Sequence, residues 1–487
     1  MSTLPQPSSP PGAAHDLARA EPPLVIDLDG TLIYSDMLWE ALLLFLKQQF
    51  WQAWRLPAWL LLGKAGFKAK LAAEVAIDPA TLPYDQVLLA HIRVERARGR
   101  RIVLATGSER GFAERIAAHL GLFDLVLATE DGVNLTSGNK AAALERHYGA
   151  AGFDYVGNCR VDLPVWQAGR HAFSVSRRPF RLAGGASTVH LGARRGHPAA
   201  ALLKAMRPRQ WLKNLLVFLP MLAGHAFGLA TLADSLLAFA AFSLCASSAY
   251  LLNDALDAHD DRLHPTKCRR PIAAGSLSLA LALGASALLA GAALALCAVL
   301  KPLLLGVVLV YFASTLSYSF VLKRLLMVDI VTLALLYTLR ILGGAAATHI
   351  APSFWLLAFS FFIFLSLALL KRYSELFNLK RQGKEKTSGR GYTIADKAPI
   401  GAMGVNAGFL SVVIFMLYIN SANVLPMYRH PEYLLGVVPL LVFWLGRLWI
   451  LAYRGEVNED PVLFVSKDRL SLAIIAACLA LATVAAL

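Results

Sequence analysis

The sequence is poor in cysteine and in charged residues. Its five cysteines follow neither a metal-ligand spacing nor a paired one, which argues against a zinc site and against a disulfide framework. Only 16% of the 487 residues are charged, whereas 57% are apolar, which is too high a share for a soluble protein of this length. The composition therefore predicts an integral membrane protein.

The N-terminus also lacks an apolar stretch. Residues 1–22 are rich in Pro, Ser and Ala, so we expect a disordered tail and no signal peptide, and the domain that follows should stay in the cytoplasm. The net charge is +15, but the basic residues fall mostly in short segments between apolar spans. This distribution favours membrane topology and phosphate binding, and no nucleic-acid partner is expected.

Short apolar runs alternate with helical stretches in residues 23–195. The pattern predicts an open parallel α/β sheet, with ligand chemistry at the carboxyl ends of its strands. The first strand would deliver Asp27 and Asp29 to that edge. The expected strands are LVIDL from residue 24, RIVLAT (101–106), LVLAT (125–129), FDYVG (153–157) and HAFSV (171–175).

Four motifs in this half resemble those of haloacid dehalogenase (HAD)-type phosphatases. They are DLDGT, Thr106 in LATGS, Lys140, and GNCRVD ending at Asp162. The resemblance implies a HAD-like (Rossmannoid) domain in which Asp27 attacks phosphorus and Asp29 protonates the leaving oxygen. It also implies that Thr106 and Lys140 hold the phosphoryl group, and that Mg²⁺ bridges Asp27 and the phosphate.

The fourth motif departs from the family pattern. HAD phosphatases usually have Gly-Asp there, whereas this chain has Gly157-Asn158, which leaves Asp162 as the acid of that motif. The resemblance assigns the metal to Asp27, Asp29, Asn158 and Asp162, but an amide oxygen brings no charge, so we expect weaker magnesium binding. The alternative is a retained fold with little or no activity.

Residues 33–98 suit a helical cap inserted over this site. They contain Trp39, Trp51, Trp54 and Trp59 together with several basic residues. This combination fits either a surface that lies on a membrane or aromatic packing inside the cap. The sequence leaves both interpretations open.

Nine apolar spans follow a basic linker at residues 196–210 and predict an all-α polytopic membrane domain over residues 211–487. The spans are 212–230, 234–252, 277–300, 303–321, 326–347, 353–370, 402–420, 433–451 and 469–487. Eighteen Lys and Arg residues lie in the loops on one side, against Lys301 and Arg429 on the other. By the positive-inside rule, the N-terminal domain and the charged loops lie on the cytoplasmic side of the cytoplasmic (inner) membrane.

Carboxylates are concentrated where the second span ends. Asp254, Asp257 and Asp261 lie at i, i+3 and i+7 and would share one helix face, with Asn253 beside them. Asp260 points elsewhere and is expected to be solvated. Clustered carboxylates at the edge of a bilayer need a cation, and Mg²⁺ that holds a diphosphate is the expected one.

The segment NDALDAHDDRLHPTKCRRPIAAG resembles the first aspartate-rich motif of the UbiA superfamily of intramembrane prenyltransferases, and Tyr318 with Lys323 and Arg324 fits the same superfamily. Members usually carry a second aspartate-rich motif after the sixth span, where this chain has KRYSELFNLKRQGKEKTSGRGY. Lys371 and Arg372 stand there in place of aspartates. Basic residues bind anionic oxygens directly, so the change argues for a substrate with an additional phosphate.

Two further segments, MRPRQWLKNLLVFLP and DIVTLALLYTLRILGGAA, resemble the decaprenyl-phosphate phosphoribosyltransferase branch. That branch transfers 5-phosphoribose from phosphoribosyl diphosphate to a polyprenyl phosphate. The resemblance implies that Asp254, Asp257 and Asp261 hold magnesium on the diphosphate and that Arg340 binds the lipid phosphate. The other implied substrate-binding residues are Asn253, Lys267, Arg270, Lys323, Lys371, Arg372 and Glu375, the last of which could complete the metal shell.

The fusion of the two parts predicts sequential chemistry: the membrane domain makes polyprenyl-phosphoryl-5-phosphoribose, and the HAD domain removes the 5-phosphate. The expected partners are a polyprenyl lipid, a phosphosugar diphosphate and the membrane, and the oligomeric state is left open. One alternative is an aromatic prenyltransferase of the quinone or haem type, which the missing second aspartate motif disfavours. The other is a lipid-binding membrane scaffold without catalysis.

Overall fold

A computed structural model describes residues 21–130, 132–193, 196–383, 385, 390–421, 427–457 and 460–487. The expected disordered tail, except for Glu21 and Pro22, lies outside the described residues. The chain divides into two compact units, of which the first comprises Met1–Ala205 with Asp254–Gly284 and the second Met206–Asn253 with Ala285–Leu487. The aspartate-rich segment thus belongs to the same unit as the N-terminal α/β domain.

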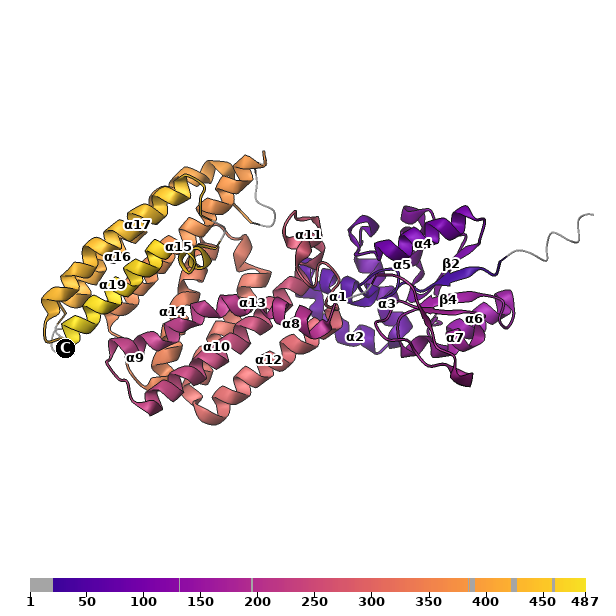
Figure 1. Ribbon diagram of the computed structural model, residues 1–487, viewed down its shortest axis with the longest axis horizontal. Coiled ribbons are helices and arrows are strands. Elements are labelled where there is room, and N and C mark those ends of the chain that lie inside the picture. The colour runs from indigo at the N-terminus through magenta and orange to yellow at the C-terminus, as the bar shows by residue number, and fades with distance from the viewer. Residues whose placement is uncertain are drawn as a thin grey trace, which may run out of the picture. The chain divides into compact units, whose positions relative to one another are not determined.

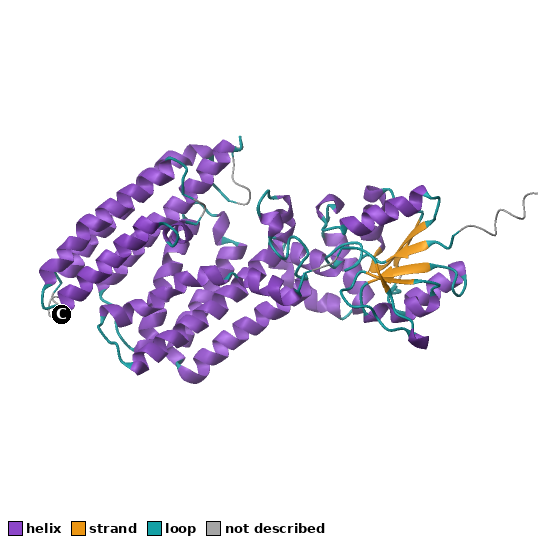
Figure 2. Ribbon diagram, in the orientation of Figure 1, coloured by secondary structure: helices purple, strands orange, loops and turns teal. Residues whose placement is uncertain are grey.

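The first unit contains one parallel sheet of six strands in the order β3-β2-β1-β4-β5-β6 (Figure 2). The five expected strands are confirmed, and the two-residue edge strand β6 was not anticipated because its side chains are exposed. The strands are β1 (Leu24–Ile26), β2 (Ile102–Glu109), β3 (Leu125–Thr129), β4 (Asp154–Gly157), β5 (Ala172–Ser174) and β6 (Val189–His190).

Helices cover both faces of this sheet (Figure 1). Alternate residues of β1 point to opposite faces, so Leu24 and Ile26 pack with α4 and α5, whereas Val25 packs with α6 and α7. This burial on both sides explains why the strands are apolar throughout. The helices are α4 (Gln86–Ala97), α5 (Arg110–Leu120), α6 (Gly138–Tyr148) and α7 (Leu163–Ala168).

The segment between β1 and β2 is helical, as the sequence predicts for a cap. Asp36 caps the first helix of this segment by accepting hydrogen bonds from the backbone of Leu38 and Trp39. Leu88 and Ile92 of α4 lie in the sheet core, so this last helix supports the sheet. The earlier elements are α1 (Met37–Gln48), the 3₁₀ helix η1 (Phe50–Arg55), α2 (Leu56–Leu60), α3 (Gly63–Glu74) and η2 (Pro79–Thr81).

The second unit is built from long apolar helices. Among the described residues, eight helices are long and apolar enough to cross a membrane. They include α10 and α12, whose ends next to the aspartate-rich segment belong to the first unit. The eight are α10 (Leu229–Leu256), α12 (Leu279–Leu300), α13 (Pro302–Phe320), α14 (Val328–Thr348), α15 (Phe354–Arg381), α16 (Lys397–Ile419, extended by η8 at Ile394–Asp396), α17 (Val437–Tyr453, preceded by η10 at Pro431–Gly436) and α19 (Arg469–Ala486).

The first of the nine expected spans is not one long helix. Residues 212–230 fall on the 3₁₀ helix η5 (Pro208–Phe218), the short helix α9 (Leu219–Ala223) and the turn before α10. Pro208 and Pro220 stand at the starts of η5 and α9, and proline lacks the N–H that a continuous α-helix would use. The remaining short elements are α8 (Pro198–Met206), α11 (Ala258–Leu263), α18 (Pro461–Val465), η3 (Arg160–Asp162), η4 (Ala183–Gly185), η6 (Lys267–Arg269) and η7 (Leu322–Arg324).

Candidate functional site

Asp27 directly follows β1, at the carboxyl edge of the sheet, and is buried. Its two oxygens have separate partners: Lys140 Nζ on α6 donates to one at 2.6 Å, and Thr31 Oγ1 donates to the other at 3.1 Å. Lys140 also donates to the Tyr155 hydroxyl at 3.0 Å. The lysine therefore neutralises the proposed nucleophile and fixes its orientation.

Asp29 lies two residues further on and faces the cap. One oxygen accepts a hydrogen bond, 2.8 Å long, from the backbone N–H of Met37, the first residue of α1. The other accepts hydrogen bonds from Ser108 Oγ at 2.6 Å and Thr106 Oγ1 at 3.3 Å, both on β2. The proposed acid thus joins the sheet edge to the N-terminus of the cap helix.

The fourth motif brings Asn158 and Asp162 to the same edge. Asn158 Nδ2 donates to the backbone carbonyl of Asp29 at 3.2 Å. Asp162 accepts hydrogen bonds from the Tyr155 hydroxyl at 2.9 Å and from the backbone N–H groups of Asn158 and Cys159 at 2.9 and 3.2 Å. With three donors, the Asp162 carboxylate serves mainly to hold this loop and Tyr155 in place.

Burial shifts the acid–base properties of these groups. Loss of hydration raises the pKa of Asp27 to about 7, because the Lys140 charge only partly opposes burial and the nearby Asp162 and Asp29 charges. Burial and the Asp36 charge raise the pKa of Asp29 to about 6, while Ser108 opposes the shift by donating a hydrogen bond. The site therefore holds protons near neutral pH until a cation or a phosphate group arrives.

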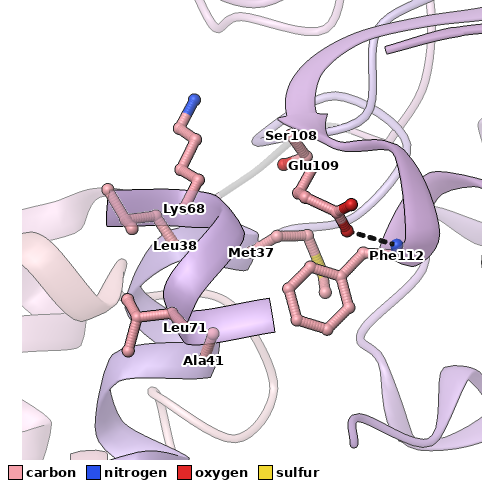
Figure 3. A pocket seen from close by; sticks show the side chains of 8 residues that line it. All are labelled: Met37, Leu38, Ala41, Lys68, Leu71, Ser108, Glu109 and Phe112. Atoms are coloured by element: carbon pink, nitrogen blue, oxygen red, sulfur yellow. Dashed lines mark hydrogen bonds between the residues drawn. The ribbon is translucent and has the colours of Figure 1, made fainter. Parts of the chain in front are cut away.

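The cap closes over this edge through α1 and α3. A narrow crevice of about 10 Å³, enough for one water molecule, lies between the cap and α5 (Figure 3). Met37, Leu71 and Phe112 give it apolar walls, and Ser108 and Lys68 are among its polar lining residues. Ser108, which donates to Asp29, connects this crevice to the phosphatase residues.

Lys68 lies on the cap helix α3 and contacts residues next to the phosphatase site. Its Nζ donates to the Gly107 carbonyl at 2.5 Å and to Asn134 Oδ1 at 3.1 Å. Burial lowers its pKa, although the charges of Asp29 and Asp36 oppose this shift. No sequence pattern distinguishes this lysine from its neighbours, but the structure makes it a candidate for binding the leaving side of a phosphate ester.

Oxygen ligands for magnesium are present but weakly charged. The Asp27 carboxylate, the Asp29 backbone carbonyl and the Asn158 amide would hold an ion together with substrate phosphate once Asn158 Nδ2 releases the Asp29 carbonyl. Such an ion would stabilise charge on the transferring phosphoryl group. Across the described parts of the chain, no three His, Cys, Asp or Glu side chains form a metal-binding group. The residues therefore fit an ion that arrives with its phosphate better than a resident one.

The aspartate-rich segment does not continue α10 as one helix, contrary to the expectation of a single shared face. The helix ends at Leu256, and Asp257 caps the short helix α11. Asp254 and Asp261 still converge, because Arg270 Nη1 donates to the first at 3.1 Å and to the second at 2.6 Å. Their shared partner shows that a single cation can contact both carboxylates.

Asp257 and Asp260 face a different partner. Lys47 Nζ, at the C-terminal end of α1, lies 3.0 Å from Asp257 Oδ1 and 2.7 Å from Asp260 Oδ2. Glu40 on the same helix forms a buried two-point pair with Arg262, at 3.1 and 2.5 Å. Asp260 is exposed, as expected, but it has an ionic partner. The N-terminal cap thus contacts the aspartate-rich segment within the first unit.

In the second unit, Lys213 and Lys371 lie near one acid. Lys213 Nζ on η5 pairs with Asp460 at 2.7 Å, with both side chains largely buried. Lys371 on α15 is close enough to Lys213 and Asp460 to interact with their charges. Lys371 also interacts with the charge of Glu375, which itself pairs with Arg372 and Arg390, so basic groups outnumber carboxylates in this region and favour an anionic ligand. Lys213 belongs to the segment MRPRQWLKNLLVFLP, whereas no sequence pattern pointed to Asp460.

Arg372 was expected to bind substrate phosphate, but its visible contacts are internal. Its side chain is fully buried and pairs with Asp329 and Glu375, and its guanidinium group lies over the Tyr392 ring. Glu375 also accepts a hydrogen bond from Arg390 at 2.6 Å. These contacts link α14, α15 and the loop after α15, so they hold that loop. Lys384 and Lys386 of the same loop lie outside the described residues.

Arg340 is likewise enclosed. Its guanidinium donates to Asn214 Oδ1 at 2.8 Å, to the Tyr311 hydroxyl at 2.9 Å and to the Leu336 carbonyl at 2.5 Å. It therefore fastens η5 to α13 and α14, and binding of a lipid phosphate would require it to change partners. Asn253, Lys267 and Lys323 are half-buried, on α10, η6 and η7.

Comparison with known protein families identifies both halves. The model of the UbiA prenyltransferase family matches residues 215–484. The chain belongs to this family. The model described as haloacid dehalogenase-like hydrolase matches residues 24–166, so a HAD-like domain precedes the UbiA part.

Relatives differ in how much of the chain they share. An uncharacterised protein, y4nM, of Sinorhizobium fredii is 35% identical over 92% of this chain and 88% of its own length. Decaprenyl-phosphate phosphoribosyltransferase of Mycolicibacterium smegmatis is 41% identical over 55% of this chain and 87% of its own. The nodulation protein NoeC of Azorhizobium caulinodans is 34% identical over 56% of this chain and 90% of its own.

Among solved structures, a UbiA homolog from Archaeoglobus fulgidus bound to GPP and Mg²⁺ aligns with 58% of this chain and 99% of its own. The sequence identity is 16% and the TM-score is 0.45. The UbiA assignment therefore rests on the family match and on the sequence relatives.

Proposed function

We propose that the membrane domain transfers 5-phosphoribose from phosphoribosyl diphosphate to a polyprenyl phosphate, and that the HAD-like domain then removes the 5-phosphate. The observation that carries the first step is the cluster of Lys213, Lys371, Arg372 and Arg390, whose basic groups outnumber the nearby carboxylates of Asp329, Glu375 and Asp460. A donor sugar with a 5-phosphate and an acceptor lipid phosphate both need cationic partners. The 41% identity to a phosphoribosyltransferase over 87% of that enzyme supports the same choice.

The transfer breaks the bond between ribose C1 and the diphosphate oxygen and forms a bond from C1 to a lipid phosphate oxygen. Diphosphate leaves with both bonding electrons, and the acceptor needs no base because a phosphate monoester is already ionised. Asp254 and Asp261, which share Arg270, are the carboxylates suited to a magnesium ion on the diphosphate. Arg270 would then be released to contact the diphosphate itself, with Asp257 and Lys267 nearby in sequence.

In the phosphatase step, Asp27 would attack phosphorus, and Lys140 would hold the phosphoryl oxygens as the bond forms. Asp29 would protonate the leaving ribose oxygen and later take a proton from water. Its pKa near 6 suits both tasks at neutral pH. Thr106 and Ser108 would keep its carboxyl group oriented.

The membrane topology of the chain is also part of what we propose. The N-terminal domain and the charged loops would lie on the cytoplasmic side of the inner membrane, and η5 with α9 would complete a ninth crossing. This placement is supported by the excess of basic residues in one set of loops. Both reactions would then occur at one membrane face.

The test supplies labelled phosphoribosyl diphosphate and polyprenyl phosphate to the detergent-solubilised protein, with and without Mg²⁺. We expect magnesium-dependent labelling of the lipid, followed by release of inorganic phosphate. Labelling only with a prenyl diphosphate and 4-hydroxybenzoate would favour the aromatic prenyltransferase. Labelled lipid without phosphate release would remove the phosphatase step and leave the transferase proposal standing.

A further inference from the structure

The cap exposes a contiguous set of large apolar side chains. Trp51 is 82% exposed, Trp54 76% and Leu61 89%, and Phe50, Leu60 and Leu62 add to the same segment. Elsewhere in the described part of residues 21–193, the exposed large apolar residues are single valines. Scattered valines are ordinary on a protein surface, whereas a cluster of aromatic and leucine side chains marks an interaction surface.

This exposure comes from a folded segment. Trp59 turns inward and packs on Phe45 with ring centroids 5.2 Å apart, and Arg55 lies over the Trp59 ring and pairs with Glu74 at 2.8 Å. The inward residues of η1 and α2 thus complete the cap core. Because those contacts fix the segment, Trp51 and Trp54 are held outward.

The segment itself carries no acidic residue; Lys47 and Arg55 are paired with Asp257, Asp260 and Glu74, whereas Lys64 and Lys70 are exposed. Between Ala41 and Ala73 the chain has no Asp or Glu, whereas it has five basic residues. They are Lys47, Arg55, Lys64, Lys68 and Lys70. Tryptophan and leucine flanked by lysine and arginine are the composition of segments that lie in the interface of an anionic membrane.

The contacts of α1 tie this segment to the residues that follow the apolar helix α10. Lys47 binds Asp257, the residue directly after the apolar helix α10, and η1 begins at Phe50, three residues after Lys47. The Glu40–Arg262 pair holds the same helix on the aspartate-rich segment. Residues 50–62 therefore directly follow a helix that is held on the segment where α10 ends.

We propose that residues 50–62 insert into the lipid surface of the membrane that the C-terminal helices cross, and anchor the phosphatase cap there. The contact with lipid is independent of the proposed function. Its consequence, that the phosphatase acts preferentially on a substrate held in the membrane, rests on that function. An anchored cap would open toward the lipid surface, where a lipid-linked phosphosugar lies.

Photolabelling tests the contact without any enzyme activity. The full-length protein is placed in nanodiscs of phosphatidylethanolamine and phosphatidylglycerol that contain a phospholipid with a diazirine in its acyl chain. We expect labelled peptides from residues 50–62 and from the membrane helices, and none from α4. Labelled membrane helices with unlabelled residues 50–62 would overturn the proposal.

A triple variant, Trp51→Ser, Trp54→Ser and Leu61→Ser, tests the consequence. The matched control replaces three exposed valines elsewhere on the domain, Val87, Val94 and Val189, by serine. We expect the first variant to lose most lipid labelling and to raise KM for a lipid-linked phosphosugar about tenfold, because interfacial binding scales with buried apolar area. Hydrolysis of a soluble phosphate ester should be unchanged in both variants, which shows that the domain is folded.

Equal loss of labelling in the valine control would contradict a specific anchor. A wild-type protein that hydrolyses neither ester would remove the phosphatase proposal, and the photolabelling result would still decide whether residues 50–62 contact lipid.

Discussion

Asn158 places a neutral amide beside two buried carboxyl groups at the phosphatase edge. Its Nδ2 donates to the Asp29 carbonyl, and Gly30, at a φ of +72°, leaves the space that this amide occupies. A carboxylate at position 158 would add charge next to Asp27, whose pKa is already raised to about 7. The amide thus permits a folded site without metal and weakens its attraction for magnesium.

Replacing Asn158 by Asp should reverse this balance. We expect the magnesium concentration for half-maximal phosphatase activity to fall roughly tenfold, the effect of about 1.4 kcal/mol of added attraction. Without magnesium, the same variant should unfold at a lower temperature because like charges repel. Asn420→Asp, an exposed site at the end of α16, is the control for added charge. An unchanged magnesium requirement would show that position 158 does not contact the ion.

The raised pKa values also predict a pH dependence of stability. Asp27 and Asp29 have folded pKa values of about 7 and 6 against an ordinary value of 3.8, so the folded state binds protons more tightly. Their contribution to stability is complete below about pH 4 and is lost as the pH rises toward 7. In chelator, denaturant titration of the N-terminal domain should show roughly 2 to 4 kcal/mol less stability at pH 8 than at pH 5. Asp27→Asn should reduce this dependence.

At the scale of elements, α1 joins two sites. Its first backbone N–H binds Asp29, and its later residues Glu40 and Lys47 bind the aspartate-rich segment. The Glu40–Arg262 pair is almost fully buried, and removing one partner of such a pair leaves an uncompensated charge. The attachment of α1 to the aspartate-rich segment therefore depends on this pair more than on the exposed contacts of the helix.

Glu40→Gln should accordingly destabilise the first unit by about 3 kcal/mol. Hydrogen exchange should rise in both α1 and residues 254–284, because both sides of the contact lose their partner. Glu114→Gln removes an exposed i,i+4 pair with Arg110 and should change stability by less than about 0.5 kcal/mol. Equal effects from the two substitutions would mean that the buried pair is not a structural link.

Sequence patterns predicted what depends on burial and periodicity. The five main strands, Asp27 and Asp29 at the sheet edge, and the long apolar helices follow from such patterns, because strands buried on both faces are apolar throughout. Partners distant in the chain, such as Lys47 with Asp257 or Lys213 with Asp460, leave no local pattern. Ser108 could have been found, since it lies two residues after Thr106 on the same strand and so on the same side.

Helix interruptions were harder to predict than helices. Residues 212–230 have the composition of a span, but Pro208 and Pro220 divide the region into η5 and α9. The regular i, i+3, i+7 spacing of Asp254, Asp257 and Asp261 assumed a continuous helix, which ends before Asp257. The prolines of the first region are visible in the sequence and could have marked its interruption, whereas in the second region no comparable local signal marks the end of the helix.

At the scale of the whole molecule, two activities on one chain should be separable. Asp254→Asn should abolish phosphoribosyl transfer and leave hydrolysis of an added phosphate ester intact, whereas Asp27→Asn should do the reverse. The second variant should accumulate lipid-linked phosphosugar, which thin-layer chromatography of the labelled lipid detects. Asp260→Asn, at an exposed carboxylate of the same segment, should leave transfer within about twofold. Loss of both activities in either variant would indicate obligatory coupling.

The length of helix α1 separates two sets of contacts. Met37 contacts Asp29 and Lys47 contacts Asp257, so about 15 Å of helix axis separates the residues that face the phosphatase acid from those that face the aspartate-rich segment. That length is about half the roughly 30 Å thickness of a bilayer's hydrocarbon core. The proposed two-step function would therefore require a headgroup to move by about this distance between Asp257 and Asp29.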